Sequence, residues 1–155
     1  MTDSGALVYV VDDDQSAREG VAALIRSAGL TPKVFASAEE FLAAPRPKTL
    51  SCLVLDVSLP GVSGLDLQQE LAKSNSPIPI VFLTGHGDIP TSVDAMKGGA
   101  EDFLTKPVRK EALFAAVERA LARDAVVAEQ RRRQSELRQR FDSLTPRERE
   151  VLAHM

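Results

Sequence analysis

The sequence predicts a doubly wound α/β domain, in which a parallel sheet is covered by helices on both faces. Three observations predict it: short apolar runs rich in β-branched residues, helical patterns between them, and an alternation of the two that repeats five times before residue 122. This order implies right-handed strand-helix-strand crossovers and a parallel sheet. Function in such sheets lies outside the carboxyl ends of the strands, so the residues that follow each strand matter most.

Five segments are expected to form the strands. The runs at 7–11, 53–55 and 80–83 are continuously apolar rather than alternating, which is typical of parallel strands buried on both faces. The segments at 33–35 and 102–105 are weaker candidates. The first three runs are therefore expected inside the sheet.

Four helical patterns lie between these strands. The first spans 17–28 and ends before Gly29, a residue type common just after a helix. Its apolar stripe consists of Val21, Leu24, Ile25 and Ala28. Ser37 and Glu40 form a capping box that opens a short second helix. Residues 64–74 and 91–97 complete the set, and the glycines at 98 and 99 stop the last one.

After Pro107 the sequence becomes suited to one long helix, because residues 108–145 contain neither glycine nor proline. The apolar stripe of Leu113, Val117, Ala120 and Leu121 predicts a helix that packs on the sheet. The stripe fades after Ala128 into a polar stretch that breaks any heptad pattern. We therefore expect a domain at 1–122 and an extended helical linker at 123–142.

A further helix start follows the linker. Thr145 suits the N-cap position, Pro146 the first helical position and Glu148 the third. The sequence ends at Met155, too soon for a domain. Residues 143–155 are thus expected to be the first helix of a truncated domain.

Composition excludes several classes of protein. The chain has 155 residues, of which 44% are hydrophobic and 26% charged, as in globular proteins. Residues 1–122 carry 11 basic and 16 acidic side chains, a net charge of −5 that argues against nucleic-acid binding by this part. A single cysteine excludes an internal disulfide and indicates a reducing compartment. With no apolar run long enough for a bilayer and no signal peptide, we expect a cytoplasmic protein without a membrane partner.

Polar residues with related chemistry follow four of the predicted strands. They are Asp12, Asp13 and Asp14 after the first, Asp56 after the third, Thr84 after the fourth and Lys106 after the fifth. Carboxylates crowded into one crevice repel each other unless a cation lies among them, and oxygen ligands of this kind favour Mg²⁺. A hydroxyl and an ammonium beside them suit the oxygens of a phosphoryl group. The pattern therefore indicates phosphoryl transfer to or from a carboxylate.

Taken one at a time, three of these residues have an ordinary structural interpretation. Asp14 is expected to be a helix N-cap, Thr84 alone is a structural hydroxyl and Lys106 alone a surface lysine. Outside this group, Cys52 is expected in the core, and His86 lacks the neighbours of a metal ligand. The arginines at 131–133 are interpreted as a solvated helix face.

Four motifs occupy these strand ends: Val11-Asp12-Asp13, the run from Asp56 to Gly64, Thr84-Gly85 and Lys106-Pro107. Together they resemble the receiver domain of bacterial two-component response regulators, over residues 7–121. The run at 83–90, followed by Ala95-Met96-Lys97 and Gly99-Ala100, is similar to the FixJ-type subfamily, whose effector is a LuxR-type helix-turn-helix. Residues 144–152 resemble the first helix of that effector.

The resemblance implies a flavodoxin-like (βα)₅ fold with strand order 2-1-3-4-5 and a role for each site residue. Asp56 would accept a phosphoryl group from a sensor histidine kinase. Asp13, Asp56 and the backbone carbonyl of Ser58 would bind Mg²⁺ directly, and Asp12 through water. Lys106 would pair with the phosphoryl oxygens, and its peptide bond to Pro107 is expected to be cis.

The resemblance also implies a switch. Thr84 would swing toward the phosphoryl group and Phe103 would turn inward behind it. Residues 91–105 would become a homodimer face, with DNA bound only through the effector that this chain lacks. The competing interpretation is that Val93 and Met96 are core residues. The family more often has Met where Leu59 stands, and the FixJ-type run usually has Met where Thr91 stands.

Two other functions remain open at this stage. One is a Mg²⁺-dependent phosphatase with an aspartate nucleophile, suggested by the Asp-x-Asp at 12–14. The late acidic pair and the cap domain of such enzymes are missing from the sequence, so we do not expect an enzyme. The other is a stand-alone receiver that sequesters a partner, against which residues 143–155 argue.

Overall fold

In the part of the chain that the structure describes, five parallel strands form one sheet with helices on both of its faces. The computed structural model describes residues 6–74, 77–85 and 89–143. The strands are β1 (Leu7–Val11), β2 (Thr31–Phe35), β3 (Ser51–Asp56), β4 (Ile80–Thr84) and β5 (Asp102–Thr105). The helices are α1 (Gln15–Ser27), α2 (Ala38–Ala43), α3 (Gly64–Ala72), α4 (Ile89–Lys97) and α5 (Lys110–Ser143). The predicted alternation of strand and helix is confirmed.

The strand order is β2-β1-β3-β4-β5, as predicted, and every neighbouring pair is parallel. The central strands β1, β3 and β4 are buried along almost their whole length, as their continuous apolar runs predict. The register pairs Val11 with Leu55 and Asp56 with Leu83. The carboxyl ends of these strands therefore meet at one edge.

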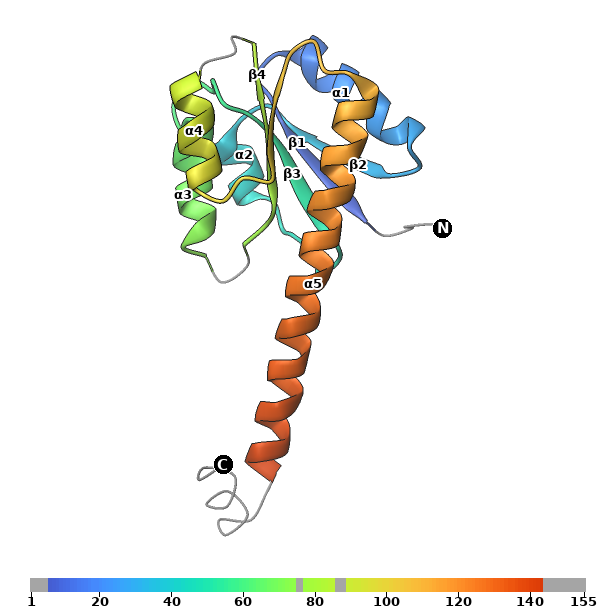
Figure 1. The fold of residues 1–155 in the computed structure, drawn as a ribbon, viewed down its shortest axis with the longest axis vertical. Helices are drawn as coiled ribbons and strands as arrows, with labels where there is room; N and C mark the ends of the chain where they lie inside the picture. The colour runs from blue at the N-terminus through green and yellow to red at the C-terminus, as the bar shows by residue number, and fades with distance from the viewer. Residues whose placement is uncertain (1–5, 75–76, 86–88, 144–155) are drawn as a thin grey trace. The chain divides into compact units, whose positions relative to one another are not determined.

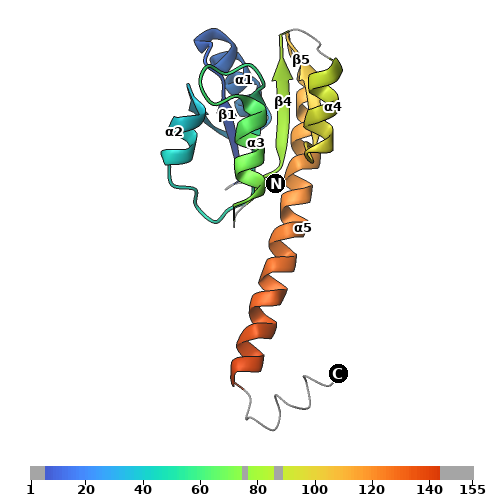
Figure 2. The same cartoon turned by 90° about the vertical axis from the view of Figure 1, so that its left-hand side faces the viewer.

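Two hydrophobic clusters cover the two faces of the sheet. One joins Tyr9, Leu55 and Phe82 to side chains of α2, α3 and α4, and the other joins Val10, Val54 and Val81 to side chains of α1 and α5. Figures 1 and 2 show α2, α3 and α4 on one side of the strands, with α1 and the first part of α5 on the other. The predicted stripe of α5 lies in the second cluster.

Several helix boundaries differ from the predicted ones. Helix α1 begins at Gln15 and ends at Ser27, so Ala28 is the C-cap residue and is exposed rather than part of the stripe; Ala22 is buried in its place. Gly29 follows with a φ of +84°, the left-handed conformation that favours glycine after a helix. Helix α3 ends at Ala72, two residues early, because Lys73 already caps it. Helix α4 begins at Ile89, two residues before the predicted start.

The chain divides into two compact units, Met1–Asp124 and Ala125–Met155, and α5 contributes to both. Of the helix predicted at 143–155, only Ser143 is described, as the last residue of α5, and residues 144–155 lie outside the described residues. Among the helices that the structure describes, none combines the length and the apolar character that a membrane span requires.

Candidate functional site

The four strand ends that were predicted to carry the site meet at one edge of the sheet. Asp12 follows β1, Asp56 ends β3, Thr84 ends β4 and Lys106 follows β5. The register places Thr84 beside Thr105, the residue before Lys106. The parallel topology therefore brings together side chains that lie up to 94 positions apart in the sequence.

Three carboxylates form a cluster at this edge. Oxygen atoms of Asp12, Asp13 and Asp56 all lie within 4.8 Å of one another. Asp12 is 1% exposed and Asp56 is 5% exposed, whereas Asp13 faces solvent. Like charges at this spacing repel, and a cation removes the repulsion. Three oxygen donors with one open side fit Mg²⁺, which binds a few carboxylates and keeps several waters.

Lys106 is the cation that the chain itself supplies to this cluster. Its Nζ atom donates to Asp12 Oδ2 at 2.9 Å and to Asp56 Oδ2 at 3.4 Å. Burial raises the pKa of the Asp12 carboxyl above its ordinary value, although the hydrogen bond from Lys106 acts in the opposite direction. Burial alone would lower the pKa of the Lys106 ammonium, but its partners Asp12 and Asp56 outweigh burial and raise it.

Backbone amides fix the two buried carboxylates. The N–H of Asp14 donates to Asp12 Oδ1 at 3.0 Å, and the N–H of Ser58 donates to Asp56 Oδ1 at 3.0 Å. Each carboxylate thus has one oxygen held by the loop that follows it and the other turned toward Lys106. This arrangement presents Asp56 in a defined orientation to a reactant arriving from the edge of the sheet.

The loop from β5 is positioned by backbone geometry. The peptide bond between Lys106 and Pro107 is cis, as expected. The N–H of Lys106 donates to the Thr84 carbonyl oxygen at 2.7 Å, which ties this loop to the end of β4. The lysine and the threonine are therefore held side by side.

Sequence reasoning missed the contributions of two residues. Arg18 on α1 donates through Nη1 to the Asp12 carbonyl oxygen at 2.8 Å, and nothing in the local pattern distinguishes it from a surface arginine. Gly64 opens α3 so close to β3 that an added Cβ would lie 2.7 Å from the Asp56 carbonyl oxygen. Gly64 belongs to the motif that begins at Asp56, and that fixed spacing was the available signal.

Thr84 and Phe103 occupy the neighbouring strands. Thr84 is 2% exposed. Phe103 on β5 is half-buried, and its ring centroid lies 6.1 Å from that of Phe82. Ser58 lies two positions after Asp56 and is exposed.

The outer face of α4 carries two exposed apolar side chains. Val93 is 44% exposed and Met96 is 47% exposed, so the interpretation of these residues as core is wrong. The small Ala95, fully buried, faces the sheet instead. Apolar spacing alone did not show which side of this short helix was turned inward.

The remaining candidates have structural explanations. Asp14 caps α1 by accepting from the Ala17 N–H at 3.2 Å, as predicted. Cys52 lies in the core, and burial raises the pKa of its thiol to about 12. The arginines at 131–133 are exposed, and two of them pair with Glu129. His86 lies outside the described residues.

Known proteins match this chain along most of its length. Residues 8–118 match the family described as the response regulator receiver domain. Nodulation protein W of Bradyrhizobium diazoefficiens is 52% identical over 147 residues, which are 95% of this chain and 65% of that protein. Response regulator protein TodT of Pseudomonas putida is 43% identical over 152 residues, 98% of this chain and 67% of that protein. The chain thus spans about two thirds of the length of these relatives.

Solved structures show the same similarity. The low-resolution structure of the response regulator StyR superposes with a TM-score of 0.88 at 48% identity, covering 96% of this chain and 75% of that one. Full-length FixJ from B. japonicum superposes with a TM-score of 0.73 at 39% identity, covering 98% and 74%.

Proposed function

Since the chain belongs to the response-regulator receiver family, we propose that Asp56 accepts a phosphoryl group from a sensor histidine kinase and thereby switches an attached transcription effector, in the cytoplasm. The observation that carries this proposal is the bridge from Lys106 to the two buried carboxylates Asp12 and Asp56. A phosphoacceptor needs a carboxylate that is buried and oriented, with a cation beside it for the incoming charge.

The transfer itself is a substitution at phosphorus. A carboxylate oxygen of Asp56 forms the new O–P bond while the P–N bond to the kinase histidine breaks, and the imidazole nitrogen leaves with the electron pair. The acyl phosphate brings roughly two negative charges into the site. Lys106 then has a stronger partner than Asp12, and the Thr84 hydroxyl, once it has moved toward the site, donates to another phosphoryl oxygen.

The carboxylate cluster supports a Mg²⁺ requirement. Asp13, Asp56 and the Ser58 carbonyl would hold the ion, with Asp12 acting through a bound water. When bound, Mg²⁺ supplies positive charge that offsets the repulsion between these carboxylates and the incoming phosphoryl oxygens. Asp13 suits this role because it is the exposed member of the cluster.

The exposed residues of α4 support a phosphorylation-dependent homodimer. We propose that Thr84 moves toward the phosphoryl group, that Phe103 turns inward behind it, and that residues 91–105 become the dimer face. Val93 and Met96 give this face an apolar centre. A ligand shifts such an equilibrium only by its differential affinity, and a complete switch needs about 5.5 kcal/mol.

We further propose that residues 1–122 are the receiver, 123–142 a helical linker and 143–155 the start of a helix-turn-helix effector. Support comes from the names of the relatives, among them transcriptional regulatory protein FixJ of Azorhizobium caulinodans, 44% identical over 145 residues. DNA would be bound through that effector and not by the acidic receiver.

The test is phosphorylation by acetyl phosphate, followed by intact mass. We expect one phosphoryl adduct that requires Mg²⁺ and is absent from Asp56→Asn. Asp66→Asn is the matched control, an exposed aspartate on α3 whose loss should leave the adduct intact. A folded protein without an adduct would contradict the proposal, and turnover of p-nitrophenyl phosphate would favour a phosphatase instead.

A further inference from the structure

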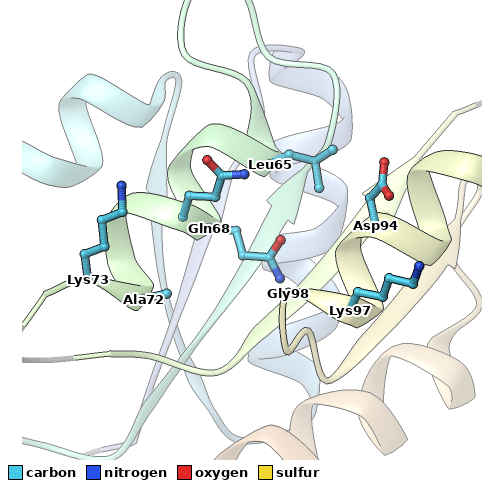
Figure 3. A pocket seen from close by; sticks show the side chains of 8 residues that line it. Leu65, Gln68, Ala72, Lys73, Asp94, Lys97 and Gly98 are labelled. Atoms are coloured by element: carbon cyan, nitrogen blue, oxygen red, sulfur yellow. The ribbon is translucent and has the colours of Figure 1, made fainter.

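One buried polar side chain connects two helices near the site. Gln68 on α3 is 6% exposed, and its Nε2 atom donates to the Ala95 carbonyl oxygen of α4 at 2.9 Å. Gln68 and Gly98 line a groove of about 470 Å³ between α3 and the C-terminal end of α4 (Figure 3). A buried amide is costly unless it is hydrogen-bonded, so this bond stabilises one relative position of the two helices.

The backbone that follows α4 packs closely against this amide. A Cβ added at Gly98 would lie 2.7 Å from Gln68 Oε1 and 2.9 Å from Nε2. The φ angle of Gly98 is not in the left-handed region, unlike that of Gly99 at +99°. The left-handed backbone therefore favours glycine at 99, whereas a side chain at 98 would displace the amide of Gln68.

Helix α3 also touches the phosphoacceptor loop at its other end. The N–H of Gly64 donates to the Val57 carbonyl oxygen at 3.2 Å, and Gly64 leaves no room for a Cβ beside the Asp56 carbonyl. Gln68 follows one helical turn later. A short, rigid segment thus links the residue after Asp56 to the end of α4.

We infer that Gln68 is a positioning residue that holds α4 in its unphosphorylated position. This inference rests on the proposed function, because it concerns the same switch. Lys106 is paired with Asp12 and Asp56, which under the proposed function is the arrangement of the unphosphorylated site. In this arrangement Gln68 is bonded to the Ala95 carbonyl oxygen, so the inference assigns that bond to the unphosphorylated position of α4. Loss of that bond shifts the equilibrium toward the dimerising arrangement without touching the acceptor chemistry.

The test compares Gln68→Leu with Gln69→Leu, a neighbour that lines the same groove but is exposed. Gln68→Leu should speed hydrogen exchange at Gly98, Gly99 and Ala100 by roughly three- to ten-fold, the range expected for one hydrogen bond. The unphosphorylated variant should also dimerise roughly three- to ten-fold more tightly, while the phosphorylated protein is unchanged. A merely structural residue would weaken the dimer in both states.

A second variant keeps the inference falsifiable if Gln68→Leu folds poorly. Gly98→Ala pushes the amide away from Ala95, so it should reproduce the faster exchange. In the Gln68→Ala background the added methyl should have no further effect, and this non-additivity identifies a direct contact.

The outcomes separate this inference from the proposed function. Exchange and dimerisation of Gln68→Leu that match those of Gln69→Leu overturn the inference, as does additivity with Gly98→Ala. If phosphorylated wild-type protein stays monomeric, exchange is compared with and without acetyl phosphate. Faster exchange of Gln68→Leu confined to the unphosphorylated protein supports the inference, and an equal effect in both states overturns it. The mass of the Asp56 adduct, measured in the same samples, tests the proposed function independently.

Discussion

The Lys106 ammonium lies closer to Asp12 than to Asp56, at 2.9 Å against 3.4 Å. The lysine therefore serves mainly to neutralise the more deeply buried carboxylate while no phosphoryl group is bound. Asp12 needs this partner because burial raises the pKa of its carboxyl. Lys106 thus has a structural role in addition to the one proposed in phosphoryl transfer.

Replacing Lys106 should therefore destabilise the fold. We expect Lys106→Met to lower the free energy of unfolding by about 2 kcal/mol without Mg²⁺, because two carboxylates lose a charged hydrogen-bond donor. Urea denaturation at neutral pH measures the change. Lys33→Met, at an exposed position on β2, should be close to neutral. Equal stability of the two variants would show that the bridge contributes nothing.

Mg²⁺ should stabilise the protein through the carboxylate cluster. At a free concentration one hundred times Kd, binding adds about 2.7 kcal/mol and raises Tm by several degrees. Asp13→Asn should abolish most of that rise. Asp14→Asn is the matched control, because asparagine caps a helix as well as aspartate does and Asp14 lies outside the cluster. A similar Mg²⁺ response in both variants would contradict the assignment of Asp13.

Two glycines should respond to alanine with opposite signs. Gly64→Ala places a methyl group against the Asp56 carbonyl and should destabilise the fold by about 1–3 kcal/mol. Gly20 lies within α1, where an added Cβ meets nothing within 4 Å, so Gly20→Ala should stabilise by about 0.5–1 kcal/mol. Thermal unfolding of the two variants tests this. Loss of stability in both variants would mean that the close approach to Asp56 is not what makes Gly64→Ala destabilising.

The Cys52 thiol should be inert in the folded protein. Burial, reinforced by the charge of Asp124, raises the pKa of the thiol from 9.0 to about 12. The unfolded chain ionises first as pH rises, so this group's contribution to stability is complete below pH 9 and is lost between pH 9 and 12. Ellman's reagent at pH 8 should react only after denaturant is added. Rapid reaction of the native protein would contradict the burial.

Much of the fold follows from sequence because central parallel strands leave a strong signal. The runs around Val10, Val54 and Val81 are apolar on both faces, and only a helix-covered sheet buries such strands. The carboxylate cluster was predictable for a related reason. Once the strands are parallel, residues that follow them must share an edge, whatever their separation along the chain.

Features that depend on side-chain direction were not predictable. Gln68 occupies one polar position in a short helix, and sequence gives no sign that its amide is buried against Ala95. Val93 and Met96 were equally ambiguous, because the buried side of α4 is occupied by the small Ala95. Three-dimensional packing, rather than residue type, decides such cases.

The exposed face of α4 offers the sharpest test of the proposed dimer. Val93→Asp and Met96→Asp should each weaken the phosphorylated dimer by about ten-fold or more, because an aspartate buried in an apolar interface loses its hydration. Leu42→Asp introduces the same charge at a similarly exposed apolar position on α2. Sedimentation velocity after acetyl phosphate treatment measures association, and intact mass shows that Asp56 is modified equally. A dimer weakened by Leu42→Asp but not by the two α4 variants would place the interface elsewhere.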